Sequence, residues 1–186
     1  MPRKAIESFI LVLALSAACT SATVTPFSKV TAVPPADPAL GAPGADWLLF
    51  VDTRYDLTFK YPKIDERGSQ IEITEFDPSP MLRDLRFRFS SRDDSSFRFE
   101  VAKIPGVSAN TFYSMLKTQK PRYPSSYIVG DLAETSLGQY PALAFDFRAG
   151  TDQSRVILVE RGPDLYQIVY TKSELASRVV ASVDFP

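Results

Sequence analysis

The sequence predicts an α+β domain built on an antiparallel β-sheet, and three observations support this fold class. First, apolar and polar residues alternate over several short segments between residues 47 and 186, which is typical of strands with one buried face. Second, two other segments place apolar residues at helical spacing. Third, clusters of turn-forming residues separate neighbouring strand segments closely enough for hairpins, which join antiparallel strands.

Several strand segments precede the first helical segment. In the earliest, Leu57, Phe59 and Tyr61 alternate with polar residues, and Pro62 ends the run. The same alternation recurs at 71–74, 85–89 and 97–101. The polar residues at 90–96, Ser-Ser-Arg-Asp-Asp-Ser-Ser, predict the turn of a hairpin between the last two segments.

The first helical segment starts at Ser108, a candidate N-cap, and ends before Pro121. It places Phe112, Met115 and Leu116 on one face. These apolar residues predict a helix that packs against the sheet.

Further strand segments and a second helix complete the domain. The strand segments lie at 143–147, 155–160 and 165–171. Arg-Gly-Pro-Asp at 161–164 predicts a hairpin turn between the last two. Thr171 and Glu174 have the T-x-x-E spacing of a capping box, so we expect the final helix to begin there. The apolar residues that follow, up to Val183, repeat at helical spacing.

Residues 1–18 have the features of a signal peptide. Basic residues near the start precede an apolar run at 9–18, and small residues occupy 16–18 directly before Cys19. The apolar run is about half of the ~20 residues needed to span a bilayer. We therefore expect residues 1–18 to direct export and to be removed.

Leu-Ser-Ala-Ala-Cys at 15–19 resembles the lipobox of bacterial lipoproteins. The resemblance implies that the Cys19 thiol receives a diacylglyceryl group, that the preceding peptide is cut away and that the new amino terminus is acylated. Lipid attachment accounts for a lone cysteine in an exported chain, and several acyl chains anchor a protein stably.

The alternative is an ordinary secretory signal, because residues 16–18 also fit a small-x-small cleavage site. With a lipid on Cys19, we expect the protein at the cell membrane or the outer membrane, facing the periplasm or the exterior. Thr20 in place of Asp after the cysteine is similar to lipoproteins that are sent to the outer membrane.

The expected mature chain divides into a tether and one domain. Residues 19–45 are rich in Pro, Ala, Ser and Thr, a composition that favours extended chain without a packed core. Residues 46–186 are long enough for a single domain with its own core. Removal of residues 1–18 leaves nineteen Lys and Arg against twenty-one Asp and Glu, so we expect no nucleic-acid partner.

The expected domain resembles PsbP/Mog1-like domains over about 55–185. The resemblance rests on three segments. The first is Phe-Lys-Tyr-Pro at 59–62, and the second is Thr-Ser-Leu-Gly-Gln-Tyr-Pro-Ala-Leu-Ala-Phe-Asp-Phe at 135–147. The third is Asp-Leu-Tyr-Gln-Ile-Val-Tyr-Thr at 164–171, which leads into a helix and then Val-Asp-Phe. It implies an antiparallel sheet with helices on both faces. Members of this family include photosystem accessory proteins, a Ran-binding protein and bacterial lipoproteins, and no functional motif carries over to this sequence.

The residue types limit the available chemistry. Histidine is absent from the sequence, which excludes Ser-His-Asp and Cys-His catalysis and histidine-ligated zinc or iron. No glycine-rich phosphate-binding motif occurs. We expect the acidic residues at 65–66, 72–77 and 93–94 to be solvated surface charge, and those near 91–96 lack the order of a dedicated calcium loop. We therefore expect no enzyme activity, no cofactor and no metal site.

The pattern that favours binding is basic. Arg86 and Arg88 alternate with phenylalanines and should lie on the opposite face of their strand, with Arg98 and Glu100 across the hairpin. Arginine favours planar, multidentate contacts with acidic groups. The candidate partner-binding residues are Arg83, Arg86, Arg88, Arg92 and Arg98. The alternative is a solvated strand face whose arginine stems cover the sheet.

Together these features predict a lipid-anchored, non-catalytic accessory or binding protein outside the cytoplasmic membrane, which engages a protein partner. The alternative is a carrier of a small ligand or of a metal ion such as calcium or manganese. A third hypothesis, a hydrolase that uses carboxylates, requires two carboxyl groups that face each other in a cleft.

Overall fold

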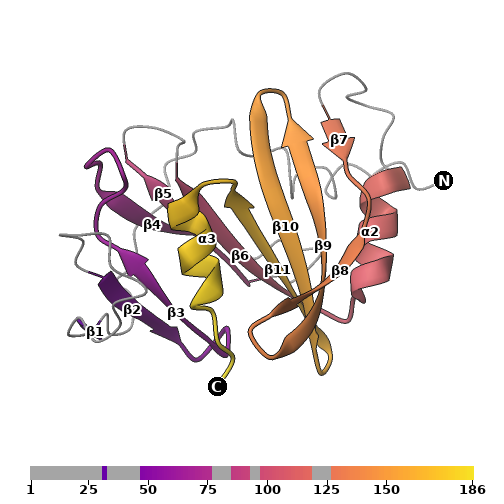
Figure 1. Ribbon diagram of the computed structural model, residues 1–186. Coiled ribbons are helices and arrows are strands. Elements are labelled where there is room, and N and C mark those ends of the chain that lie inside the picture. The colour runs from indigo at the N-terminus through magenta and orange to yellow at the C-terminus, as the bar shows by residue number, and fades with distance from the viewer. Residues whose placement is uncertain (1–30, 33–46, 77–84, 93–96, 119–126) are drawn as a thin grey trace.

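The structure is a computed structural model, and it describes residues 31–32, 47–76, 85–92, 97–118 and 127–186. Its strands form two antiparallel sheets, labelled in Figure 1. The small sheet has the order β1 (Thr31–Ala32), β2 (Trp47–Asp52) and β3 (Leu57–Pro62). The large sheet has the order β4 (Ile71–Phe76), β5 (Leu85–Ser91), β6 (Arg98–Pro105), β11 (Asp164–Thr171), β10 (Asp152–Arg161), β9 (Tyr140–Ala149) and β7 (Tyr127–Val129), and β8 (Ala133–Leu137) also pairs with β9.

Two short helices accompany the sheets, α2 (Ala109–Thr118) and α3 (Glu174–Ala181). The predicted antiparallel sheet with two helices is therefore confirmed. Within the described ranges, neither helix has the length and apolar character needed to cross a bilayer.

The strand predictions were incomplete at the start and in the middle of the domain. β2, β7 and β8 were not predicted. Within the stretch predicted as a tether, Thr31 and Ala32 pair with Leu49 and Leu48 of β2. The signal peptide, Cys19 and the remainder of the tether lie outside the described residues.

Both helices begin with a serine N-cap. At α2, the Ser108 Oγ accepts a hydrogen bond from the Thr111 N–H at 3.2 Å, so the predicted N-cap is confirmed. The capping box predicted at Thr171 is wrong. Thr171 still pairs with Ser154 as the last residue of β11, and α3 begins after Ser173, whose Oγ accepts from the Ala176 N–H at 3.1 Å.

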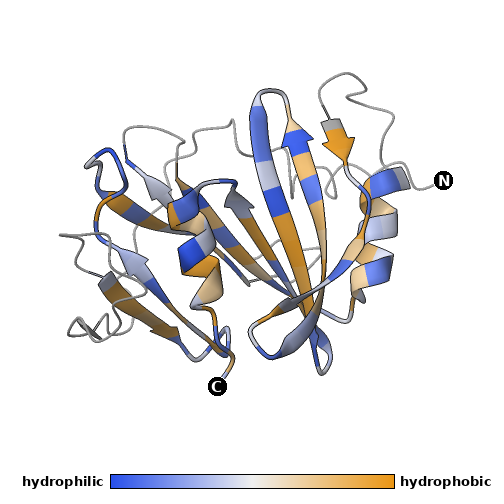
Figure 2. Cartoon of the chain, in the orientation of Figure 1, coloured by the Kyte–Doolittle hydropathy of each residue, from blue (hydrophilic) through white to orange (hydrophobic). Residues whose placement is uncertain are grey.

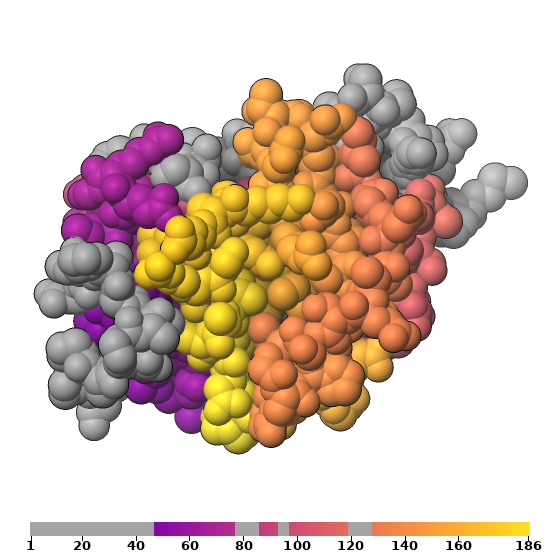
Figure 3. All heavy atoms as spheres, in the orientation of Figure 1, coloured from indigo at the N-terminus to yellow at the C-terminus, as the bar shows by residue number. Residues whose placement is uncertain are grey.

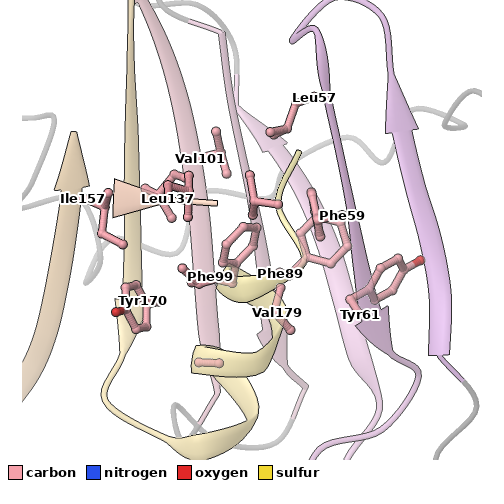
Figure 4. Close-up of a cluster of buried hydrophobic side chains, with 14 of the residues drawn as sticks. Leu57, Phe59, Tyr61, Phe89, Phe99, Val101, Leu137, Ile157, Tyr170 and Val179 are labelled. Atoms are coloured by element: carbon pink, nitrogen blue, oxygen red, sulfur yellow. The ribbon is translucent and has the colours of Figure 1, made fainter. Parts of the chain in front are cut away.

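The larger core cluster is aromatic and lies between the two sheets (Figure 4). Phe59 of β3 contacts Phe99 of β6 with 4.8 Å between ring centroids, and Phe50 of β2 contacts Phe87 of β5 at 4.9 Å. Val179 brings α3 into the same cluster. The phenylalanines of this cluster are buried, and they join the small sheet to the large one.

A second core cluster lies beneath α2. Phe112 and Leu116 pack with Val156 and Leu158 of β10. Ile157 belongs to the aromatic cluster instead, because consecutive strand residues point to opposite faces. This second cluster covers the face of the sheet at β6, β9, β10 and β11, and among the described residues it includes none from β4 and β5.

The carboxyl-terminal residues close the domain. Thr58 of β3 and Asp184 exchange two backbone hydrogen bonds of 2.9 Å. The Phe185 carbonyl accepts from the Tyr140 hydroxyl at 2.8 Å and from Arg161 Nη1 at 3.2 Å. The tail is therefore part of the fold.

A buried carboxylate at the end of β2 makes stability depend on pH. Asp52 is 4% exposed and accepts hydrogen bonds from the Arg54 N–H at 2.8 Å and from Arg54 Nε at 3.0 Å. Burial raises the pKa of Asp52, but the bonds and charge of Arg54 outweigh burial and hold it below its usual value.

Asp52→Asn should therefore lower the free energy of unfolding by about 1 kcal/mol at pH 7, a modest value because Arg54 is half exposed. A carboxyl whose pKa is lowered in the folded state stabilises the folded protein at pH values above its unfolded-state pKa. This contribution disappears as the pH falls through the folded-state pKa. Urea unfolding at pH 7 and at pH 3 measures how much less stable Asp52→Asn is than the native protein. This loss of unfolding free energy should be smaller at pH 3 than at pH 7. An equal difference at both pH values, or the same behaviour in the exposed control Asp131→Asn, would contradict this assignment.

Candidate binding face

Strand register places the arginine pattern on one face of the large sheet. Arg88 lies opposite Glu100, and Ser90 lies opposite Arg98, across the β5–β6 pair. Arg86 and Arg88 therefore share a face with Arg98 and Glu100. We call the surface formed by Arg86, Arg88, Arg92, Arg98, Glu72 and Glu100 the arginine face.

One carboxylate holds two guanidinium groups at the centre of the arginine face. Glu100 Oε2 accepts from Arg88 Nε at 3.0 Å, and Glu100 Oε1 lies 3.7 Å from Arg86 Nε. The side chains of Arg86, Arg88 and Glu100 are only 12%, 22% and 11% exposed. The arginines are thus not an open cationic ribbon, because their stems lie along the sheet and Arg88 also stacks over the Phe76 ring at 4.9 Å.

The rim of the arginine face is more accessible. Arg92 is 61% exposed and lies 3.2 Å from Glu72 Oε1. Arg83 lies outside the described residues, so the structure does not place it.

The prediction that the acidic residues are solvated surface charge is wrong for Asp65, which is buried, and other predicted acidic groups also have structural partners. Asp65 accepts from the Ser91 hydroxyl at 2.6 Å and from the Ser69 N–H at 2.8 Å, which fixes the turn before β4. Glu75 pairs with Arg54, and Glu66 accepts from the Leu175 N–H at the start of α3. Asp93 and Asp94 lie outside the described residues.

Arg98 occupies a different environment from the other arginines. Its backbone N–H donates to Thr171 Oγ1 at 3.2 Å, and its Nη2 donates to Ser154 Oγ at 3.3 Å. Its Nε is buried and makes no hydrogen bond within the described structure. Burial lowers the pKa of Arg98, Glu100 and Asp152 oppose that shift, and the like charge of Arg88 adds to it.

A cleft of about 320 Å³ begins at Arg98. Its lining comes from the start of β6, from the β9–β10 turn and from the link between β11 and α3, and comprises Arg98, Thr151, Asp152, Gln153, Ser154, Thr171, Lys172 and Ser173. Figure 1 shows the β9–β10 turn and the start of α3 at the same end of the large sheet, and Figure 3 shows both at the surface there. In Figure 2, β10 is hydrophilic at this end and hydrophobic further along. We call this hollow the Arg98 cleft.

The comparisons with known proteins bear on the fold. No family model and no curated protein matches the sequence. The solution structure of cyanobacterial PsbP (CyanoP) from Synechocystis sp. PCC 6803 is similar, with a TM-score of 0.55 and 12% identity over 78% of this chain and 96% of that chain. The fold is PsbP-like. A crystal structure from Bacteroides thetaiotaomicron VPI-5482 is more distant, with a TM-score of 0.42 and 14% identity over 74% of this chain and 48% of that chain.

On this PsbP-like domain the arginine face and the Arg98 cleft meet at one residue. Arg98 lies between Glu100, on its own strand, and Ser154, which is two strands away. Sequence reasoning found Arg98 but not the cleft, because Ser154, Thr171 and Lys172 join it only through the strand order β6-β11-β10.

The charges of the PsbP-like domain favour the binding of anions on this side. Among the described residues, four arginines face two glutamates on the arginine face, whereas the whole protein has a formal net charge of −1. Over the described ranges, no three acidic or cysteine side chains gather as metal ligands would. The lining of the Arg98 cleft includes one carboxylate, Asp152, rather than the facing pair that carboxylate hydrolysis requires.

Proposed function

We propose that this protein is a non-catalytic accessory protein, held at a membrane by lipid on Cys19, which binds an acidic segment of a protein partner on its arginine face. In this proposal the PsbP-like domain, with helices on both faces of its sheet, is a binding module. The excess of arginine on a net-negative protein is the observation that carries it.

The chemistry of the arginine face suits carboxylates. A guanidinium offers five N–H donors. Among the described residues, Nε and Nη2 of Arg88 contact Glu100. Arg92 offers an exposed guanidinium beside it, whose pairing with Glu72 is at the surface and therefore weak. A partner's Asp or Glu side chains could exchange with Glu72 at little cost.

The proposed location follows from the sequence before the tether. The lipobox-like 15–19 supports a lipid anchor at the cell membrane or outer membrane, facing the periplasm or the exterior. A tether at 19–45 would let the domain reach a membrane-bound partner. Mass spectrometry of the amino-terminal peptide tests the lipid on Cys19 independently of the binding experiment.

The test of the arginine face uses peptides of defined charge. A twelve-residue Asp/Glu-rich peptide and its Lys-rich counterpart are titrated onto the full-length protein in mild detergent. We expect the acidic peptide to bind, and the double variant Arg88→Gln/Arg92→Ser to bind it about tenfold more weakly, since two charge contacts together contribute about 1.4 kcal/mol. Binding should also weaken as salt rises.

Arg148→Ser is the matched control, because it removes an exposed arginine from β9, away from β5 and β6. It should change the affinity by less than about twofold. Equal binding of the acidic and basic peptides, or an acidic-peptide affinity that the double variant leaves unchanged, would refute the arginine face as the docking site.

A further inference from the structure

The Arg98 cleft has a chemistry of its own, separate from docking on the arginine face. It is lined by two cationic side chains, Arg98 and Lys172, and by several hydroxyl groups. Its volume of about 320 Å³ lies near the lower end of the range found for small-ligand sites.

The charge of the half-buried Arg98 side chain in this cleft is only partly compensated by carboxylates. Glu100, the nearest carboxylate on its strand, is bonded to Arg88 at 2.9 Å and paired with Arg86. Arg98 Nε has no hydrogen-bond partner in the described structure, and the bond from Nη2 to Ser154 is long at 3.3 Å. Such a guanidinium gains from an added acceptor, because a buried donor without a partner costs free energy.

Two hydroxyl groups contact Arg98. Ser154 Oγ accepts from the guanidinium, and Thr171 Oγ1 accepts from the Arg98 backbone N–H. Each hydroxyl therefore keeps its own proton for donation to a ligand within the part of the chain that the structure describes.

Two carboxylates lie in or near the Arg98 cleft. Asp152 contributes to the lining, and Asp146 accepts from Lys172 Nζ at 2.7 Å. Asp146 also lies 3.6 Å from Arg155 Nη1, so it keeps a cationic neighbour if Lys172 turns toward a ligand. The lining then carries two positive charges against one negative charge.

We propose that the Arg98 cleft binds a small oxyanion, a carboxylate or a phosphate of metabolite size, with Arg98 and Lys172 as its cationic contacts and Ser154 and Thr171 as hydroxyl donors. A planar guanidinium accepts two oxygens of either group. This proposal does not depend on the docking of a partner at the arginine face.

The test titrates the full-length protein in mild detergent with inorganic phosphate and, separately, with succinate. Isothermal titration calorimetry and thermal unfolding are read in parallel, with sodium chloride at matched ionic strength as the reference. We expect saturable binding of at least one probe, with a Kd of about 1 mM or tighter, and a rise in Tm that chloride does not reproduce. Phosphate alone indicates phosphate esters, and succinate alone indicates organic acids.

Variants then locate the bound anion. Arg98→Gln should weaken the affinity for the binding probe at least tenfold, and Lys172→Gln should weaken it about threefold. Ser154→Ala and Lys172→Gln keep the test decisive if Arg98→Gln does not fold. Absence of saturable binding by both probes, or binding that survives the cleft variants, overturns the proposal.

The same titrations separate this proposal from the docking of a partner. Lys172→Gln should leave the affinity for the acidic peptide unchanged, because Lys172 lies outside the arginine face. Arg92→Ser should leave the affinity for phosphate or succinate unchanged, because Arg92 does not line the Arg98 cleft. Arg98 belongs to both surfaces, so Arg98→Gln is left out of this comparison. If Lys172→Gln or Arg92→Ser abolished both affinities together, two separate sites would be contradicted.

Discussion

Replacing Phe59 by alanine should lower the free energy of unfolding by about 4 kcal/mol, the largest effect that we expect from a single substitution. The Phe59 ring is fully buried and contacts Phe50 of its own sheet and Phe87, Phe89 and Phe99 of the large sheet. Truncation would leave a cavity between the two sheets that neither can easily fill, because both are held by backbone pairing.

Urea unfolding followed by circular dichroism measures this loss. Val51→Ala is the matched control, since Val51 on the neighbouring strand is 39% exposed and should cost less than about 0.5 kcal/mol. A loss at Phe59 below about 1.5 kcal/mol would mean that the sheets repack, and that the aromatic cluster does not join them as described.

Replacing Glu100 by glutamine should lower the free energy of unfolding by about 2–3 kcal/mol, although the two side chains have nearly the same shape. Glu100 is the carboxylate that Arg88 and Arg86 share, and it also lies near Arg98. Without its charge, three guanidinium groups remain close together on a half-buried surface. Their mutual repulsion and the loss of the charged acceptor both destabilise the folded state.

Salt provides the diagnostic measurement. Unfolding in 50 mM and in 500 mM sodium chloride should show a smaller loss at the higher salt, because screening weakens repulsion between partly exposed charges. Glu72→Gln, an exposed glutamate on the same face, should cost less than about 0.5 kcal/mol. A loss at Glu100 that is independent of salt would assign its role to hydrogen-bond geometry rather than to charge.

Local pattern predicted the strands whose two faces differ in polarity. β3, β5 and β6 each alternate between a buried aromatic position and a polar one, so a period of two was visible. β2 begins Trp-Leu-Leu-Phe, and consecutive apolar residues do not distinguish a strand from a buried helix turn. β7 and β8 are short, and both pair with β9. Their own sequences carry no local signal of this pairing.

The same contrast applies to the candidate sites. Alternation alone placed Arg86 and Arg88 opposite the phenylalanines, and the hairpin at 90–96 placed Arg98 and Glu100 beside them. The burial of these arginines could not be read from the sequence, because long stems can lie along a sheet or extend into solvent. The Arg98 cleft could not be predicted, because it requires β6 to lie beside β11, and these two strands are far apart in the chain.

The position of β11 has a consequence for biosynthesis. β11 is made after every other described strand, yet it lies at the centre of the large sheet, between β6 and β10. Until it emerges, β6 and β10 each present an unpaired edge, and such edges pair readily with other chains. The contacts that Thr58, Tyr140 and Arg161 make with Asp184 and Phe185 form later still, once residues 184–185 have been made. The large sheet therefore cannot be completed before β11 has emerged, and until then a nascent chain depends on protection of the β6 and β10 edges from its neighbours.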